Sequence, residues 1–223
     1  MTIALVLLSA IMAIVVGWLV HKTLNTTPWV EQRTVDMNGR DGALALLPVQ
    51  VGLGVFLAVA TSLFALLITA YHMRMMEADW TNLDLPRVLW LNSAVLVLAS
   101  VAMQWTLVAA RRGRIDSVRK GLAASGVFSF AFLAGQVWAW QQLNGSGQFT
   151  SFNPAYAFFL LLTAMHGIHL LGGLAVWARA TLRAVRGADF AKVRLSVELC
   201  TVYWHFLLLV WAVLFAVLLY SHR

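Results

Sequence analysis

Four ionisable side chains lie in the last third of the chain, among residues that are almost all apolar. They are His166, His169, Glu198 and His205. Imidazole nitrogens ligate haem iron and other metals, and a carboxylate near an imidazole can relay protons. Because ionisable groups are costly in apolar surroundings, each of the four is a candidate functional residue.

The spacing of the histidines suits two kinds of chemistry. His166 and His169 are three residues apart and share one face of a helix. At about 1.5 Å per residue, His166 and His205 fall at a similar depth in antiparallel helices, where two histidines could hold a haem iron. Hydrogen bonding across closely packed helices uses the same histidines and the glycines beside them. We favour hydrogen bonding over haem ligation.

Glu198 precedes His205 by two helical turns, so the two side chains share a face. A proton relay between them would need water across a gap of about 10 Å. An acid near the end of an apolar segment also pairs with a nearby base such as Arg194, and we favour that pairing. The single cysteine, Cys200, lies in the same segment and is interpreted as a buried packing residue.

The segments that carry these residues are long and apolar. Apolar residues make up 61% of the 223 residues and charged residues 11%, against about 25% charged in a soluble domain. Isolated strands would leave backbone groups unpaired in lipid, and a helix needs about 20 residues to cross a bilayer. We therefore predict an all-α, polytopic bundle of six transmembrane helices. The apolar stretches run over 3–20, 43–71, 88–110, 121–143, 155–178 and 195–220.

The basic residues mark one side of the membrane. The formal net charge is +7, and the bases gather in three connections, within 22–40, 111–120 and 179–194. By the positive-inside rule these connections are cytoplasmic, which places both termini in the periplasm. This distribution argues against a nucleic-acid partner as the reason for the charge.

We expect two parts along the chain. Residues 1–42 form an N-terminal transmembrane helix and a cytoplasmic connection, and residues 43–223 form a five-helix core. No base precedes the first apolar stretch and Lys22 follows it, the reverse of the charge order in a signal peptide. We therefore expect the first helix to remain in the protein.

Two motifs occur in order in the last two apolar stretches. The first contains Thr163, His166, Gly167, His169 and the pair Gly172-Gly173. The second contains Glu198, the run Tyr203-Trp204-His205-Phe206 and Trp211. Together they resemble the penultimate and final helices of haem-copper oxidase subunit III.

Weaker similarity to the same family continues upstream, so that the resemblance covers about 52–220. It includes Asn92 on the third stretch and Gln136 on the fourth. Three positions depart from the family, because Ala60, Ala139 and Leu208 stand where its members carry, or often carry, an acid. No proton-uptake role of those acids is carried over to this chain. The single helix before the five-helix core is a further difference from other family members.

The resemblance implies a non-catalytic accessory subunit of a respiratory haem-copper oxidase, acting in aerobic electron transport in the bacterial inner membrane. It implies a V-shaped bundle that binds catalytic subunit I and other oxidase subunits and holds phospholipid. Haem and copper are expected in the partner subunits and none in this chain. The residues implied in lipid binding or helix packing are Gln136, His166, Gly167, His169, Glu198, Tyr203, Trp204, His205 and Trp211.

Two alternatives remain open from the sequence. One is the related accessory protein of nitric oxide reductase, which shares the same helices. The other is an independent membrane cytochrome that binds haem through His166 or His169 together with His205.

Overall fold

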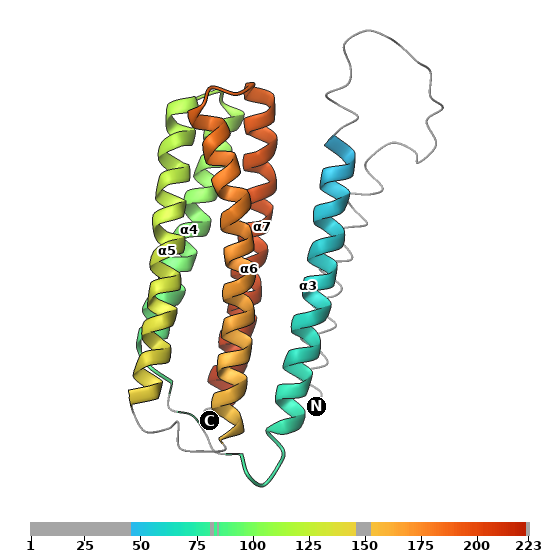
Figure 1. The fold of residues 1–223 in the computed structure, drawn as a ribbon, viewed down its shortest axis with the longest axis vertical. Coiled ribbons are helices and arrows are strands. Elements are labelled where there is room, and N and C mark those ends of the chain that lie inside the picture. The colour runs from blue at the N-terminus through green and yellow to red at the C-terminus, as the bar shows by residue number, and fades with distance from the viewer. Residues whose placement is uncertain (1–45, 81–82, 84, 146–152, 222–223) are drawn as a thin grey trace, which may run out of the picture. The chain divides into compact units, whose positions relative to one another are not determined.

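A computed structural model describes residues 46–80, 83, 85–145 and 153–221 of the chain. Each described helix is long and apolar enough to cross a membrane, which confirms an all-α membrane protein for this part of the chain. The predicted helix over 3–20, the connection that follows it and the boundary after residue 42 lie outside the described residues. The helices are α3 (Leu46–Arg74), α4 (Val88–Arg111), α5 (Ile115–Gly145), α6 (Pro154–Val185) and α7 (Phe190–Ser221) (Figure 1).

The helices run further than the apolar stretches that predicted them. α5 begins at Ile115 although its apolar stretch begins at Gly121, and α6 continues to Val185 although its stretch ends at Ala178. Arginine and lysine are good helix formers, so the helices continue through the basic segments. Several bases that the prediction placed in loops therefore belong to helices: Arg119, Lys120, Arg179, Arg183, Lys192 and Arg194.

Short turns follow α4 and α6 at the end of the molecule where the bases gather, which we call the basic end. The backbone N–H of Arg114 donates to the Ala109 carbonyl at 3.1 Å and closes the last turn of α4. Gly113 and Gly187 have φ angles of 74° and 70°, in the left-handed region that glycine adopts readily. The glycines thus allow short turns. One turn joins α4 to α5 and the other joins α6 to α7, each pair forming an antiparallel hairpin.

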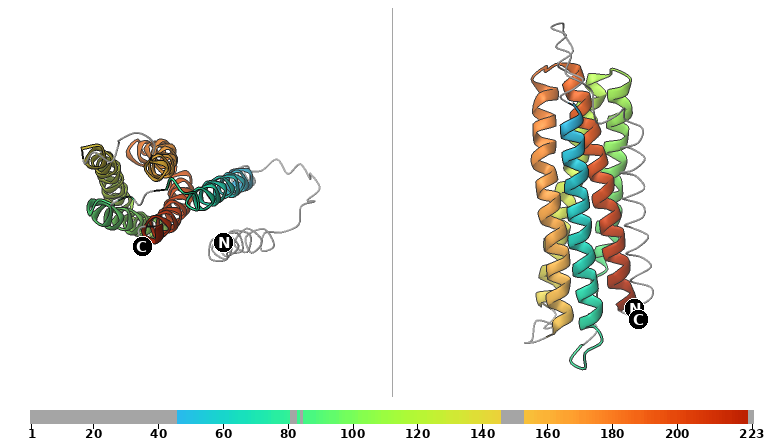
Figure 2. Two further views of the ribbon diagram at one scale, coloured as in Figure 1. Left: turned by 90° about the horizontal axis from the view of Figure 1, so that it is seen from below. Right: turned by 90° about the vertical axis from the view of Figure 1, so that its right-hand side faces the viewer.

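Helices α4 to α7 form an up-and-down four-helix bundle, seen along its axis in Figure 2. α4 and α6 each pack against α5 and α7, so the ring of contacts is closed. The chain divides into two compact units, the first ending within α3 at Thr69 and the second beginning at Ala70 and containing the bundle. The largest side chains in the core of the bundle include Met103, Leu122, Phe132, Phe159, Trp204 and Trp211.

The outside of the bundle is apolar as well. Val127 is 66% exposed, Trp90 61% and Val101 58%. In lipid, burial of apolar surface gives little preference for one packing over another, because the hydrocarbon chains are as apolar as the side chains. Shape and hydrogen bonds must therefore specify how these helices pack.

In α3 up to Thr69, three hydroxyl side chains are satisfied within the helix. The hydroxyl groups of Thr61, Ser62 and Thr69 donate to carbonyls four residues earlier, at 2.7, 3.0 and 2.9 Å. Such bonds remove free hydroxyl donors from the hydrocarbon. This part of α3 is thus compatible with an apolar surrounding.

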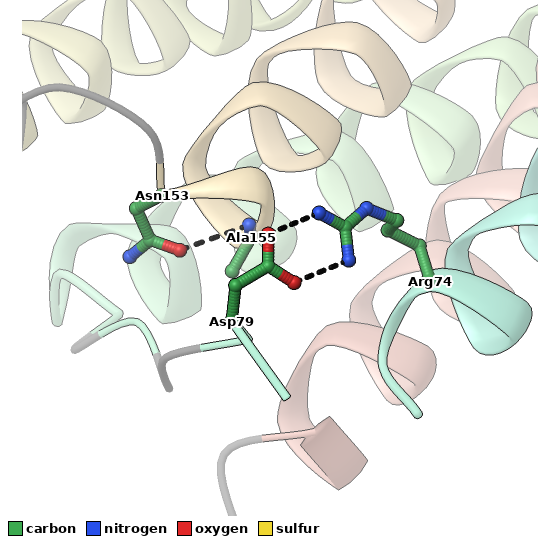
Figure 3. Close-up of polar contacts among 4 residues, drawn as sticks. All are labelled: Arg74, Asp79, Asn153 and Ala155. Atoms are coloured by element: carbon green, nitrogen blue, oxygen red, sulfur yellow. Dashed lines mark hydrogen bonds and ion pairs between the residues drawn. The ribbon is translucent and has the colours of Figure 1, made fainter. Parts of the chain in front are cut away.

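Two polar contacts order the segments at the end opposite the basic end (Figure 3). Arg74 Nη1 donates to Asp79 Oδ1 at 2.6 Å, and Arg74 Nη2 pairs with the second oxygen of the same carboxylate. These hydrogen bonds lower the pKa of the Asp79 carboxyl below its ordinary value. Asn153 caps α6 by accepting a bond from the Ala155 N–H at 3.0 Å, with Pro154 as the first helical residue.

Candidate functional site in the helix bundle

His166 lies inside the bundle with 0% of its surface exposed. Its Nε2 donates to the Leu207 carbonyl at 3.2 Å, since a carbonyl oxygen can only accept. The ring packs against Trp211 and Phe132, with centroid distances of 5.1 and 5.6 Å. In this tautomer Nδ1 is an acceptor, and the described residues supply no donor for it. His166 thus joins α6 to both α5 and α7.

His169 and Tyr203 form a second tie between α6 and α7. His169 Nδ1 donates to the Met165 carbonyl of its own helix at 2.8 Å, and the His169 carbonyl accepts from the Tyr203 hydroxyl at 2.8 Å. The Tyr203 ring lies over Gly173, where an added Cβ would come within 2.6 Å of Tyr203 Cε1. At Gly167 an added Cβ would meet nothing within 4 Å. Of these two glycines, only Gly173 makes room for a neighbouring helix.

Three tryptophans tie helices together by the same arrangement. Each indole N–H donates to a hydroxyl on another helix, and that hydroxyl donates to a backbone carbonyl of its own helix. An indole N–H left unpaired in hydrocarbon would cost free energy, so each tie favours one helix arrangement. The pairs, with N···O distances of 3.0, 2.9 and 3.0 Å, are Trp204 with Ser129, Trp211 with Ser93 and Trp140 with Thr163.

His205 lies on the outer side of the bundle, at the seam between α4 and α7. Its Nε2 lies 3.1 Å from Gln104 Oε1 and its Nδ1 lies 2.5 Å from Ser100 Oγ. Because an amide oxygen only accepts, Nε2 carries the proton and Nδ1 accepts from the Ser100 hydroxyl. Both ring nitrogens of His205 are therefore used to hold α7 against α4.

Glu198 pairs with a base on a neighbouring helix. Its Oε1 lies 3.5 Å from Arg111 Nη2 on α4. The partner is thus Arg111 and not Arg194, because α7 packs against α4 and brings the two ends together. Between Glu198 and His205, the Thr201 hydroxyl lies 3.3 Å from the Met103 carbonyl of α4. The α4–α7 seam is therefore polar at several levels, each level being a contact across the two helices.

Gln136 and Asn92 form a buried amide pair between α5 and α4. Asn92 Nδ2 donates to Gln136 Oε1 at 3.2 Å, and the two residues are 3% and 2% exposed. An added Cβ at Gly135 would lie 2.4 Å from Asn92 Oδ1, so the helices are in close contact here. The Gln136 amide nitrogen has no acceptor among the described residues. Ala139 is 0% exposed, so the family's acid would stand in a closed core at that position.

The predicted residues do not converge on one ligand-binding centre. His166 lies inside the bundle and His205 on its outer side, and both imidazoles are hydrogen-bonded to helix neighbours. In the described ranges, no group of three or more His, Cys, Asp or Glu could hold a metal ion. Cys200 is buried, as predicted. What this arrangement of side chains does chemically is to hydrogen-bond helices to one another.

Several of these residues could not be singled out from the sequence. Ser93, Ser129 and Ser100 accept or donate the bonds that complete the ties, but serine in an apolar helix usually bonds its own backbone. What identifies them as partners is a position opposite a tryptophan or histidine, and that requires knowledge of the helix packing.

Comparisons with known proteins support the motif assignment. A family model described as cytochrome c oxidase subunit III matches residues 3–222. The cytochrome c oxidase subunit 3 of Thermostichus vulcanus is 29% identical over 174 residues, covering 75% of this chain and 85% of the relative. The probable cytochrome c oxidase subunit 3 of Nocardia farcinica is 28% identical over 175 residues, with 75% and 85% covered. The chain belongs to the cytochrome c oxidase subunit III family and has the role of an accessory subunit.

Proposed function

We propose that this chain lies beside catalytic subunit I of a respiratory oxidase, contacts other oxidase subunits and phospholipid, and stabilises the catalytic subunit during turnover. Haem and copper belong, in this proposal, to the partner subunits. The proposal takes the complex to reduce oxygen, in agreement with the names of the relatives.

One observation carries the proposal. Three large side chains of the two motifs, His166, Trp204 and Trp211, are each at most 1% exposed and pack between helices. Such residues make a firm bundle and are not available to a substrate. A bundle of this kind is suited to support a neighbouring subunit in the membrane, where packing and hydrogen bonds specify association.

We further propose that the basic end faces the cytoplasm across the bacterial inner membrane, with both termini in the periplasm. Exposed bases gather at that end, and acids there are few. This is the bias that the positive-inside rule describes. The exposed bases at the basic end include Arg112, Arg114, Lys120, Arg186, Lys192 and Arg194.

We assign phospholipid contact to exposed side chains of the bundle. His166, Trp204 and Trp211 are closed off from lipid, which leaves them helix packing as their role. The exposed bases of the basic end stand where anionic headgroups are attracted, and Glu198 is half-buried beside them. Lipid binding thus concerns the rim of the bundle and not its core.

The test is isolation of the complex. An affinity-tagged chain is expected to co-purify in mild detergent with a large haem-containing subunit, identified by mass spectrometry and visible spectroscopy. Deletion of this chain is expected to shorten the time over which the remaining oxidase consumes oxygen. A stable chain without such a partner would refute the proposal, as would a catalytic subunit that reduces nitric oxide instead of oxygen.

A matched pair of variants sharpens the test. Trp211→Ala removes a buried tie, whereas Trp138→Ala changes a side chain that is 53% exposed on α5. The first variant is expected to reduce recovery of the complex and the second to leave it unchanged. A Soret band from the purified chain alone, lost in His205→Ala, would instead support the bis-histidine cytochrome.

A further inference from the structure

The membrane-facing surface of the bundle has a polar interruption at the α4–α7 seam. Gln104 and His205 are both exposed there. At about 1.5 Å per residue, His205 lies roughly 23 Å from either end of α7, and Gln104 about 10 Å from the end of α4 at Arg111. These two polar side chains therefore stand at hydrocarbon depth and not in the headgroup region.

The Gln104 amide is not satisfied by the bundle alone. Its oxygen accepts from His205 Nε2 at 3.1 Å, but its nitrogen carries two N–H donors. In the described part of the chain, the bond with His205 is the one hydrogen bond that the Gln104 side chain makes. Exposed Ser62 and Thr69 differ, because their hydroxyls donate to carbonyls of their own helix. An amide donor facing hydrocarbon without an acceptor is costly.

The surroundings of Gln104 form a helix-sized apolar strip. Val97, Val101 and Trp105 are 44%, 58% and 49% exposed, and together with Gln104 they lie along one side of α4. We call these four residues the α4 outer strip. A lipid chain could cover the apolar members, but it offers nothing to the amide.

α5 provides the contrast. Its exposed mid-helix side chains, such as Val127, Phe130 and Val137, are apolar, at 66%, 55% and 47% exposure. Lipid chains alone can cover that face of α5. The α4 outer strip has the same apolar character and adds the Gln104 amide, and polar side chains of this kind promote association between membrane helices.

We propose that the α4 outer strip is the docking surface for a transmembrane helix of a partner oxidase subunit, whose side-chain hydroxyl or amide oxygen accepts a hydrogen bond from the Gln104 amide. This inference rests on the proposed function, because it takes the chain to be part of an oxidase complex. It adds the surface and the chemistry that the partner helix must present.

The test is site-specific crosslinking in the intact complex in its native membrane. A photoreactive amino acid replaces Val101 in one version of the chain and Val127 in the other, two exposed valines on different helices. The substitution at 101 is expected to give a discrete adduct with a partner-subunit peptide, and the substitution at 127 to give lipid adducts. Adducts at 101 with lipid only, with a second copy of this chain or with residues 1–45 would overturn the proposal.

Two variants test the hydrogen bond itself. Gln104→Met keeps the length of the side chain and removes the amide, whereas Ser100→Ala removes the other partner of His205 and leaves the amide in place. Gln104→Met is expected to lower retention of the partner in detergent about threefold, the size of one membrane hydrogen bond, with Ser100→Ala unchanged. Equal retention in both variants and the wild type would refute the donor role. If the wild-type chain co-purifies with the haem subunit but these results fail, only this inference falls; if it does not co-purify, the proposed function falls.

Discussion

The inside of the bundle around His166 and its outer seam around His205 use the same residue type at a similar depth for different purposes. His166 is fully buried, and its ring packs against both Trp211 and Phe132. His205 is exposed and bonds two polar side chains of α4, Ser100 and Gln104. Depth in the membrane therefore does not decide the role of a histidine. What matters is whether the groups around it complete its hydrogen bonds within the bundle.

The largest effect on stability is expected from a substitution in the inner region, around His166. Trp211→Ala removes a buried ring from contact with His166 and Phe132 and removes the donor to Ser93. We expect a loss of about 3–5 kcal/mol in the free energy of unfolding, from the cavity that forms. Reversible unfolding by sodium dodecyl sulfate in mixed micelles, followed by circular dichroism, measures it.

Trp138→Ala is the control, because that side chain is 53% exposed on the same bundle. If both substitutions cost the same, the inner layer would have no special part in the stability of the bundle.

A smaller effect is expected from overpacking at the α6–α7 tie. Gly173→Ala places a Cβ within 2.6 Å of the Tyr203 ring, so the ring or the helix must shift. We expect a loss of about 1–3 kcal/mol in the free energy of unfolding. Gly167→Ala, where nothing lies within 4 Å, is the matched control and is expected to be neutral or stabilising. Equal losses at 167 and 173 would mean that helix flexibility, and not the Tyr203 contact, decides.

The sequence predicted the described helices but not all of their ends. The apolar stretches predicted the five described helices, because a bilayer demands long uncharged segments. They did not predict that α5 begins at Ile115 or that α6 ends at Val185, because hydropathy records where lipid ends and not where the helix ends. The backbone hydrogen bonds continue past the hydrocarbon, through basic residues that form helices well.

The site was predictable as a set of residues but not as a set of contacts. The motifs selected His166, His169, Tyr203, Trp204 and His205, but their partners lie on other helices. Glu198 shows the reason, since the local candidate was Arg194 and the packing of α7 on α4 supplies Arg111. Likewise, one sequence cannot distinguish a histidine that faces the bundle core from one that faces outwards.

Substitution of each histidine by leucine tests the difference between the two regions. In the isolated chain, His166→Leu is expected to cost about 1 kcal/mol in the free energy of unfolding, because it removes a buried hydrogen bond. His205→Leu is expected to cost about 0.6 kcal/mol, typical of a hydrogen bond between membrane helices. In the assembled complex the order is expected to reverse, with His205→Leu releasing the partner subunit more readily because Gln104 loses its support. Retention of the partner on a detergent-washed affinity column measures this, and an unchanged order would mean that the seam is not an interface.

The smallest effect concerns a polar contact outside both regions, the ion pair of Arg74 and Asp79. Here water competes for both groups, so the pair contributes little to stability and acts mainly on the titration of the acid. The Arg74 hydrogen bonds lower the pKa of Asp79, so their contribution is present above the ordinary carboxyl pKa and is lost as the pH falls through the lowered value. Carbon-13 spectra of the carboxyl in detergent micelles should show a titration midpoint below the ordinary value, which returns to it in Arg74→Gln. An Asp79 midpoint that is the same in both proteins would show that the pair is not formed in solution. Unlike the histidine ties, whose strength comes from exclusion of water, this pair should also weaken with added salt.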